Sequence, residues 1–460
     1  MSRIDSPGIL GNEIRFCGFF PEEGAMSFSV KDLLRAQVAP ALGCTEPVAV
    51  ALAAAAAAAV LPGRPERIDL WVDPNIYKNG LAVIIPGTGG LSGLDLAGAL
   101  GAFGGNPALG LEVLEPLTPE SVQAARTLVR DGGVTLNLLQ DQRGLFIRAE
   151  VFDGSHVAEA VIREMHDNVV GVSLDGQPLP LDTASPRAAA KADVSRLEAW
   201  IKALTLEDLV RLLDDLDDED REFLMEGVRT NMRLAEHGLK FGPGLGIGKA
   251  LDRLVRQKLI CRDMVLAARI LTSAASDARM GGVKLPAMSS AGSGNHGLTA
   301  ILPIWAIRDF IVCDEKTVLE AMALSHLVTA YVKAHTGRLS AICGCSVAAG
   351  AGASAGVAYL LGGNLAHIAG AIKNIIEDLA GVICDGAKAG CSLKLATAAG
   401  TAVQSALFSL QGVNVLHTDG IIGASPEQTM QNIGTLSTEG MIETDRTILK
   451  IMLEKRFSGF

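Results

Sequence analysis

Residues 66–178 interrupt a chain whose other segments carry helical patterns, and this change constrains the fold more than any other feature. Within the stretch, short runs such as R-I-D-L-W-V-D and G-L-F-I-R-A-E-V-F are rich in β-branched and aromatic residues and predict strands. Runs such as L-D-L-A-G-A-L-G-A-F lie between them and predict helices. We therefore expect an α/β or α+β domain with a small sheet.

Helical periodicity dominates on both sides of this domain. Residues 194–240 and 250–458 predict mostly helices, with glycine breaks in the second range. Residues 28–61 predict one or two further helices, the second of which follows the break A-L-G-C-T-E-P. If the helix at 44–61 joins the C-terminal helices, the strand-rich domain is an insertion. The predicted fold class is α+β, with a mostly helical catalytic bundle and a smaller α/β domain inserted near the N-terminus.

The change in pattern also sets domain boundaries, because a chain of 460 residues is too long for one ordinary core. In the simplest interpretation the inserted domain holds substrate-binding helices in place, and the alternative is regulation by a small molecule. The predicted segments are an irregular N-terminal tail at 1–25, a helical catalytic domain formed by 26–63 and 194–460, the inserted domain at 64–180, and a linker at 181–193.

Composition and charge exclude several classes of function. The net charge of −11 provides no basic surface for phosphates, so we expect no nucleic-acid partner. The alanine-rich run at 48–61 is shorter than the roughly 20 apolar residues of a membrane span, so it predicts a buried helix and no membrane association. The N-terminus lacks the pattern of a signal peptide, which favours a cytoplasmic protein with reduced thiols.

Four of the eight cysteines fall within residues 343–391, and this clustering favours metal or redox chemistry over packing. Cys384 and Cys391 flank a turn in a C-x6-C pattern, which is neither a zinc ribbon nor a thioredoxin-like pair. A helix is predicted to begin at or just after Cys391, where its dipole and free amides favour a thiolate. On these residues alone, packed thiols and a ligand pair are equal alternatives.

The segment A-I-C-G-C-S-V-A-A-G-A-G has the same design, with two cysteines at a glycine turn and a small-residue helix that begins near Ser346. Successive thiols in C-x-C point in different directions, so we expect only one of Cys343 and Cys345 to reach a shared centre. Two segments with thiols at helix starts predict convergence on one iron–sulfur cluster, because thiolates are the ligands that such clusters need.

A polar, glycine-rich turn at 287–297 supplies further candidates. Backbone amides between Ser293 and Gly297 can form a nest suited to a carboxylate. Asn295 adds a hydrogen-bonding group, and His296 adds a possible acid or base. The alternative is a structural turn with a hydrogen-bonded histidine.

Other segments carry isolated candidates. Asp277 and Arg279 lie in an apolar setting and predict a structural ion pair rather than a substrate contact. Cys44 lies at another predicted helix start, with Thr45 as the N-cap, and this position lowers the pKa of a thiol. Cys44 is therefore a candidate ligand, base or packed thiol. Residues 74–80 predict a turn beside a strand.

Four motifs together resemble the bacterial and archaeal L-cysteine desulfidase family, which is related to the alpha part of iron–sulfur L-serine dehydratases. They are G-C-T-E-P, S-S-A-G-S-G-N-H-G, C-G-C-S-V-A-A-G and C-D-G-A-K-A-G-C-S-L-K, in that order, and the resemblance covers residues 28–458. It implies an oxygen-sensitive [4Fe–4S] cluster, no pyridoxal phosphate, and conversion of L-cysteine to pyruvate, ammonia and sulfide. The dehydratases have a Ser-His-Thr type motif where this chain has Gly43-Cys44-Thr45, and this departure argues against serine as the substrate.

The resemblance also implies roles for individual residues. By analogy with the dehydratases, three cysteines hold the cluster and one iron stays open. The implied ligands are Cys345, Cys384 and Cys391, with Cys343 or Cys44 as the alternative. The implied catalytic and substrate-binding residues are Cys44 as the preferred α-proton base, His296 as the other candidate base, Lys388 for the substrate carboxylate, and Thr45, Ser293, Asn295, Gly297 and Lys394 around the substrate.

Three alternatives stand beside this interpretation. The first is an L-serine dehydratase that uses the same cluster. The second is pyridoxal phosphate chemistry at Lys388 or Lys394, and the third is a redox sensor or metal-storage protein without turnover. The expected partner is a small amino-acid substrate, and the sequence also allows a homo-oligomer.

Overall fold

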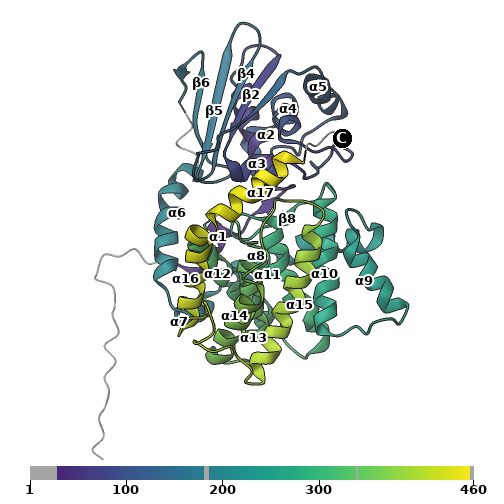
Figure 1. The fold of residues 1–460 in the computed structure, drawn as a ribbon, viewed down its shortest axis with the longest axis vertical. Coiled ribbons are helices and arrows are strands. Elements are labelled where there is room, and N and C mark those ends of the chain that lie inside the picture. The colour runs from purple at the N-terminus through teal and green to yellow at the C-terminus, as the bar shows by residue number, and fades with distance from the viewer. Residues whose placement is uncertain (1–27, 181–185, 338–339, 456–460) are drawn as a thin grey trace, which may run out of the picture.

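The protein consists of two packed units, a sheet-containing unit and a larger helical unit, which lie one above the other in Figure 1. The structure is a computed structural model and describes residues 28–180, 186–337 and 340–455. The predicted α+β class with a helical majority is confirmed. The tail predicted at 1–25 lies outside the described residues, as do residues 181–185 of the predicted linker.

A six-stranded mixed sheet forms the first unit, with the strand order β3-β2-β4-β5-β6-β7. The pair β2 and β3 is parallel, and the other pairs are antiparallel. Burial alternates along β4, which places Ile147, Ala149 and Val151 on the covered face. The strands are β2 (Arg67–Val72), β3 (Val134–Leu138), β4 (Phe146–Phe152), β5 (Val157–Arg163), β6 (Val169–Leu174) and β7 (Gln177–Pro178).

Helix α2 (Thr45–Ala58) belongs to the sheet unit. It packs against β4, β5 and α4 (Leu94–Gly104), and α5 (Pro119–Arg130) packs on the other side of α4. The prediction that this helix joins the helical bundle is therefore corrected. Its alanine run has no polar face, so periodicity indicates no packing direction, whereas its small side chains allow α4 to approach closely.

Gly101 lies where α4 approaches the backbone of α2 closely. A Cβ atom at this position would lie 2.0 Å from the backbone oxygen of Ala51. We expect Gly101→Ala to push the two helices apart and to destabilise the protein by about 2 kcal/mol. Thermal unfolding measures the effect, and Gly171→Ala, whose Cβ would meet open space, is the matched control. Equal melting temperatures for the two variants would contradict this account of the packing.

Helix α3 (Pro74–Gly80) replaces the turn predicted for the same residues. Asp73 caps this helix by accepting hydrogen bonds from the backbone N–H groups of Asn75 at 2.8 Å and Ile76 at 3.1 Å. The end of the helix carries Asn79 to the junction between the two units.

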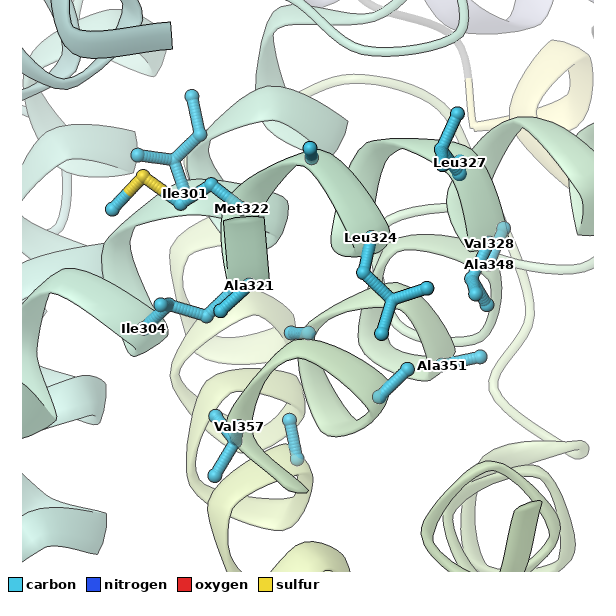
Figure 2. Packing of buried hydrophobic residues seen from close by; sticks show 14 of the residues in the cluster. Ile301, Ile304, Ala321, Met322, Leu324, Leu327, Val328, Ala348, Ala351 and Val357 are labelled. Carbon is cyan, nitrogen blue, oxygen red and sulfur yellow. The ribbon is translucent and has the colours of Figure 1, made fainter. Parts of the chain in front are cut away.

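Three helices form the centre of the helical unit: α11 (Gly294–Ile307), α12 (Glu315–Thr336) and α13 (Ala348–Leu360). Figure 2 shows Ile304, Leu324 and Val357 from these helices packed in one apolar layer. None of the described helices has the length and apolarity needed to cross a membrane. The other elements of this unit are α1 (Val30–Gln37), β1 (Pro40–Ala41), α6 (Pro186–Ala203), α7 (Leu206–Arg211), α8 (Asp218–Phe241), α9 (Ile247–Arg256), α10 (Met264–Met280), β8 (Ala287–Met288), α14 (Leu365–Leu379), α15 (Cys391–Leu410) and α16 (Pro426–Thr435).

Two predicted boundaries differ from the structure. Residues 186–193 of the predicted linker are helical, because α6 begins at Pro186, where proline suits the first turn. The last helix, α17 (Ile442–Glu454), leaves the helical unit and runs across the junction to pack against α3. An ion pair between Asp445 of α17 and the buried Lys78 of α3 joins the two.

Candidate functional site

A cavity of about 80 Å³ lies where the two units meet. Its wall combines the start of α2 and the end of α3 with the end of α10, the start of α11 and two cysteine-containing turns. Most residues singled out in the sequence line this cavity, namely Cys44, Thr45, Ser293, Asn295, His296, Cys343, Cys345, Cys384, Cys391 and Lys394.

A short antiparallel pairing brings the two cysteine turns together. Ile342 and Ile383 form an isolated β-bridge. The Cys343 N–H donates to the backbone oxygen of Val382 at 2.8 Å, and the Cys384 N–H donates to that of Ala341 at 2.6 Å. Segments that are far apart in the sequence are therefore held side by side by backbone hydrogen bonds.

The thiols differ in how readily they ionise. Hydrogen bonds from Cys345 and Ser346 lower the pKa of the Cys343 thiol to about 6, despite its burial. Burial raises the pKa of Cys391 to about 12 and also raises the pKa of Cys384. The predicted thiolate at the start of α15 is thus not favoured in the structure, because the loss of hydration outweighs the helix dipole.

The donor set suits an iron–sulfur cluster, because five thiols line one cavity and four of them, Cys343, Cys345, Cys384 and Cys391, influence one another electrostatically. Within the described residues, no group of three or more His, Cys, Asp or Glu side chains is already arranged to hold a metal ion. The structure therefore supplies the type of ligand in one place, without a preformed coordination geometry.

Cys44 occupies the N-cap of α2, one residue earlier than the cap predicted at Thr45. Burial raises the pKa of the Cys44 thiol to about 11, although Arg279 nearby acts in the opposite direction. The expectation of a lowered pKa is therefore corrected. Next to this thiol, the Glu46 carboxylate accepts hydrogen bonds from the Thr45 hydroxyl at 3.2 Å and the Asn79 amide at 3.1 Å.

His296 lies in the first turn of α11 and is buried. Its Nδ1 is 3.2 Å from the backbone oxygen of Ser290, which can only accept, so Nδ1 carries the proton and Nε2 keeps a free lone pair. Burial, followed by the charge of Lys333, lowers the pKa of His296 to about 3. Gly344, between two cysteines, lets the ring approach, because a Cβ there would lie 2.5 Å from Nε2. The imidazole is therefore neutral at pH 7.

Asp277 and Arg279 do not form the predicted ion pair. The Asp277 carboxylate accepts from the backbone N–H of Gly248 at 2.9 Å. The Arg279 guanidinium instead donates to Asn295 Oδ1 at 2.9 Å and to the backbone oxygen of Gly43 at 2.7 Å. Residues two apart on a helix face different sides, which explains why the pair does not form.

The two candidate lysines bind the same carboxylate. Lys388 and Lys394 each form an ion pair with Asp385, the second at 2.6 Å. Burial acts to raise the pKa of Asp385, but the two ammonium groups hold it at about 2. Lys394 lines the cavity, whereas Lys388 and Gly297 lie outside its lining.

The sequence interpretation missed several residues of the cavity wall as site residues, among them Glu46, Asn79, His166, Arg279 and Lys333. Glu46 directly follows the predicted N-cap at Thr45, Asn79 was hidden in a predicted turn, and Lys333 lies in the last turns of a long, mostly buried helix. A charged side chain directly after the mostly apolar run L-V-T-A-Y-V was the signal that could have indicated Lys333.

Behind the cavity, His326 of α12 makes stability depend on pH. Its Nδ1 lies 2.9 Å from Ser290 Oγ, and burial lowers its pKa to about 4, compared with about 6.5 for an unfolded histidine. Between these values the unfolded chain binds more protons, so stability is full above about pH 6.5 and is lost as the pH falls toward 4. From pH 7 to pH 5 we expect a loss of about 2 kcal/mol.

The variant His326→Gln tests this expectation. Its melting temperature should fall less between pH 7 and pH 5 than that of the wild type, and His417→Gln, at an exposed position, should behave like the wild type. An unchanged fall in His326→Gln would contradict the assignment.

Comparison with known proteins assigns the chain to a family. A model of the serine dehydratase alpha chain matches residues 108–450. The chain therefore belongs to the serine dehydratase alpha chain family, a family of lyase-type enzymes related to the alpha part of iron–sulfur serine dehydratases. The relationship inferred from the motifs is confirmed at this level.

Curated relatives cover nearly the whole chain. A UPF0597 protein of Desulfatibacillum aliphaticivorans is 66% identical over 437 residues, which cover 94% of this chain and 100% of that protein. A UPF0597 protein of Clostridioides difficile (strain 630) is 45% identical over 421 residues, which cover 92% of this chain and 98% of that protein.

Proposed function

We propose that the protein is an iron–sulfur-dependent lyase that acts on L-cysteine. The observation that carries the proposal is the meeting of five thiols with a neutral histidine and several buried charged groups in one cavity. In the proposed reaction the substrate loses its α-proton and its β-sulfur as sulfide. The remaining 2-aminoacrylate takes up water and gives pyruvate and ammonium.

Cys345, Cys384 and Cys391 are the proposed ligands of a [4Fe–4S] cluster, and Cys343 or Cys44 is the alternative. Cys343 and Cys345 belong to one C-x-C turn, so only one of them is proposed as a ligand. When bound, the cluster supplies an open iron that acts as a Lewis acid toward the leaving group. Iron has affinity for soft sulfur ligands, which suits a thiol substrate.

His296 is the proposed acceptor of the α-proton. Its Nδ1 is held by Ser290, so the Nε2 lone pair is available at neutral pH. Lys333 and Arg279 oppose a positive charge on the ring. An anionic group on the bound substrate offsets these cations and so favours proton uptake at the time of reaction. Cys44, whose thiol keeps its proton at pH 7, is the weaker candidate.

L-Serine is the second candidate substrate, because the matching family model describes serine dehydratases. Loss of water instead of sulfide gives the same 2-aminoacrylate. The residues at 43–45 differ from the Ser-His-Thr type motif of those enzymes, which favours cysteine.

Anaerobic purification with iron and sulfide analysis, followed by assays with L-cysteine and L-serine, tests the proposal. We expect bound iron, and pyruvate released faster from cysteine than from serine. Pyruvate from serine alone would replace the proposal by the dehydratase. A colourless protein without iron after anaerobic reconstitution would exclude the cluster.

A further inference from the structure

The cavity contains two buried opposite charges that do not pair with each other. Arg279 is 4% exposed and Glu46 is 8% exposed. Neither side chain takes part in an ion pair within the described residues. Isolated buried charges are unfavourable unless a partner of opposite charge is supplied.

Each charge is held by an asparagine. Asn295 Oδ1 accepts from the Arg279 guanidinium at 2.9 Å, and the Asn79 amide donates to the Glu46 carboxylate at 3.1 Å. The guanidinium has five N–H groups, and its buried Nε has no hydrogen-bond partner among the described residues. Both charged groups therefore have a fixed orientation and remaining capacity to bind a ligand.

The segment at 43–46 places both charges on the same part of the cavity wall. The Arg279 guanidinium donates to the backbone oxygen of Gly43 at 2.7 Å, and Glu46 follows in the first turn of α2. A ligand that bridges the two charges therefore lies in front of Cys44, at the junction of the two units. Lys388 and Lys394 are less suited to this role, because both ammonium groups already bind the Asp385 carboxylate.

We propose that Arg279 and Glu46 together bind the zwitterion of an α-amino acid, with Arg279 on the carboxylate and Glu46 on the ammonium group. This inference names the ligand subsites of the proposed function and rests on it for the identity of the site. A planar guanidinium can bind a carboxylate through two parallel hydrogen bonds. The pair selects free amino acids, because an amine or an acid alone would leave one buried charge unpaired.

Calorimetry on the anaerobically reconstituted full chain tests the inference with three ligands. L-Alanine has both charged groups and no leaving group, 3-mercaptopropionate lacks the ammonium, and cysteamine lacks the carboxylate. Arg279→Gln should weaken the binding of L-alanine and of 3-mercaptopropionate by about 30-fold or more. It should leave the affinity for cysteamine unchanged. Glu46→Gln should weaken the binding of L-alanine and of cysteamine to a similar extent. It should leave the affinity for 3-mercaptopropionate unchanged.

Matched substitutions at an exposed ion pair, Glu207→Gln and Arg211→Gln, should change none of the three affinities. The ligand that each site variant still binds reports that the variant is folded. Equal losses for all three ligands, or no loss, would overturn the assignment. Binding in the expected pattern by a protein that releases no pyruvate would uphold these subsites and reject the proposed reaction.

Discussion

Replacing Cys384 by serine is expected to remove bound iron and pyruvate formation together. The Cys384 backbone is fixed by its hydrogen bond to Ala341, so a serine hydroxyl would take the same place without being a soft ligand. Loss of a residue that only orients a metal ligand costs 10–100-fold in affinity or activity, so loss of a ligand should reduce turnover by at least about 100-fold. Iron analysis and pyruvate release, both under anaerobic conditions, measure the two effects.

Cys261→Ser provides the control, because this cysteine is exposed and lies outside the cavity. It should keep full iron content and turnover. Separate Cys343→Ser and Cys345→Ser variants decide which member of the C-x-C turn is a ligand, since only one should lose iron. Full iron content in Cys384→Ser would contradict its assignment as a ligand.

Removing the negative charge of Asp445 is expected to destabilise the junction strongly. Lys78 is 1% exposed, and Asp445 is its ion-pair partner. Asp445→Asn leaves a buried ammonium group without a counter-charge, which we expect to cost about 3 kcal/mol. The melting temperature should fall, and α17 should become more accessible to protease because it loses its link to α3.

Two further variants make this prediction specific. Glu443→Gln removes an exposed ion pair on the same helix and should change stability by less than about 1 kcal/mol. The double variant Lys78→Met with Asp445→Leu removes both charges and should be more stable than Asp445→Asn alone. A double variant no more stable than the single one would contradict the explanation by an unpaired charge.

Patterns local to a few residues predicted which segments meet at the cavity better than they predicted the packing partners of helices. The cysteine turns and the 287–297 segment are recognisable because glycine and small residues mark helix starts, and the structure brings them to one cavity. The position of α2 could not be predicted, since a helix apolar on all sides carries no information about direction. The packing of α17 against α3 was equally hard to predict, because Asp445, the partner of Lys78, lies near the other end of the chain.

The charged groups of the site show a second limit. Asp277 and Arg279 are close in sequence and opposite in charge, so a pair was the simplest expectation. Their real partners, Gly248 and Asn295, depend on how α10 is rotated in the bundle. The ionisation of Cys44 and Cys391 was misjudged for a related reason, since helix position is visible in a sequence and depth of burial is not.

The location of the cavity at the junction between two cores has a consequence for the order of folding. Cys44 and Glu46 belong to the sheet unit, whereas Cys384 and Cys391 follow more than three hundred positions later in the helical unit. Contacts between such distant segments form late, after each core has condensed. A ligand that contacts both cores, as the proposed substrate does through Glu46 and Arg279, can be bound only after the two cores have docked, so binding of this ligand would report completed assembly of the chain.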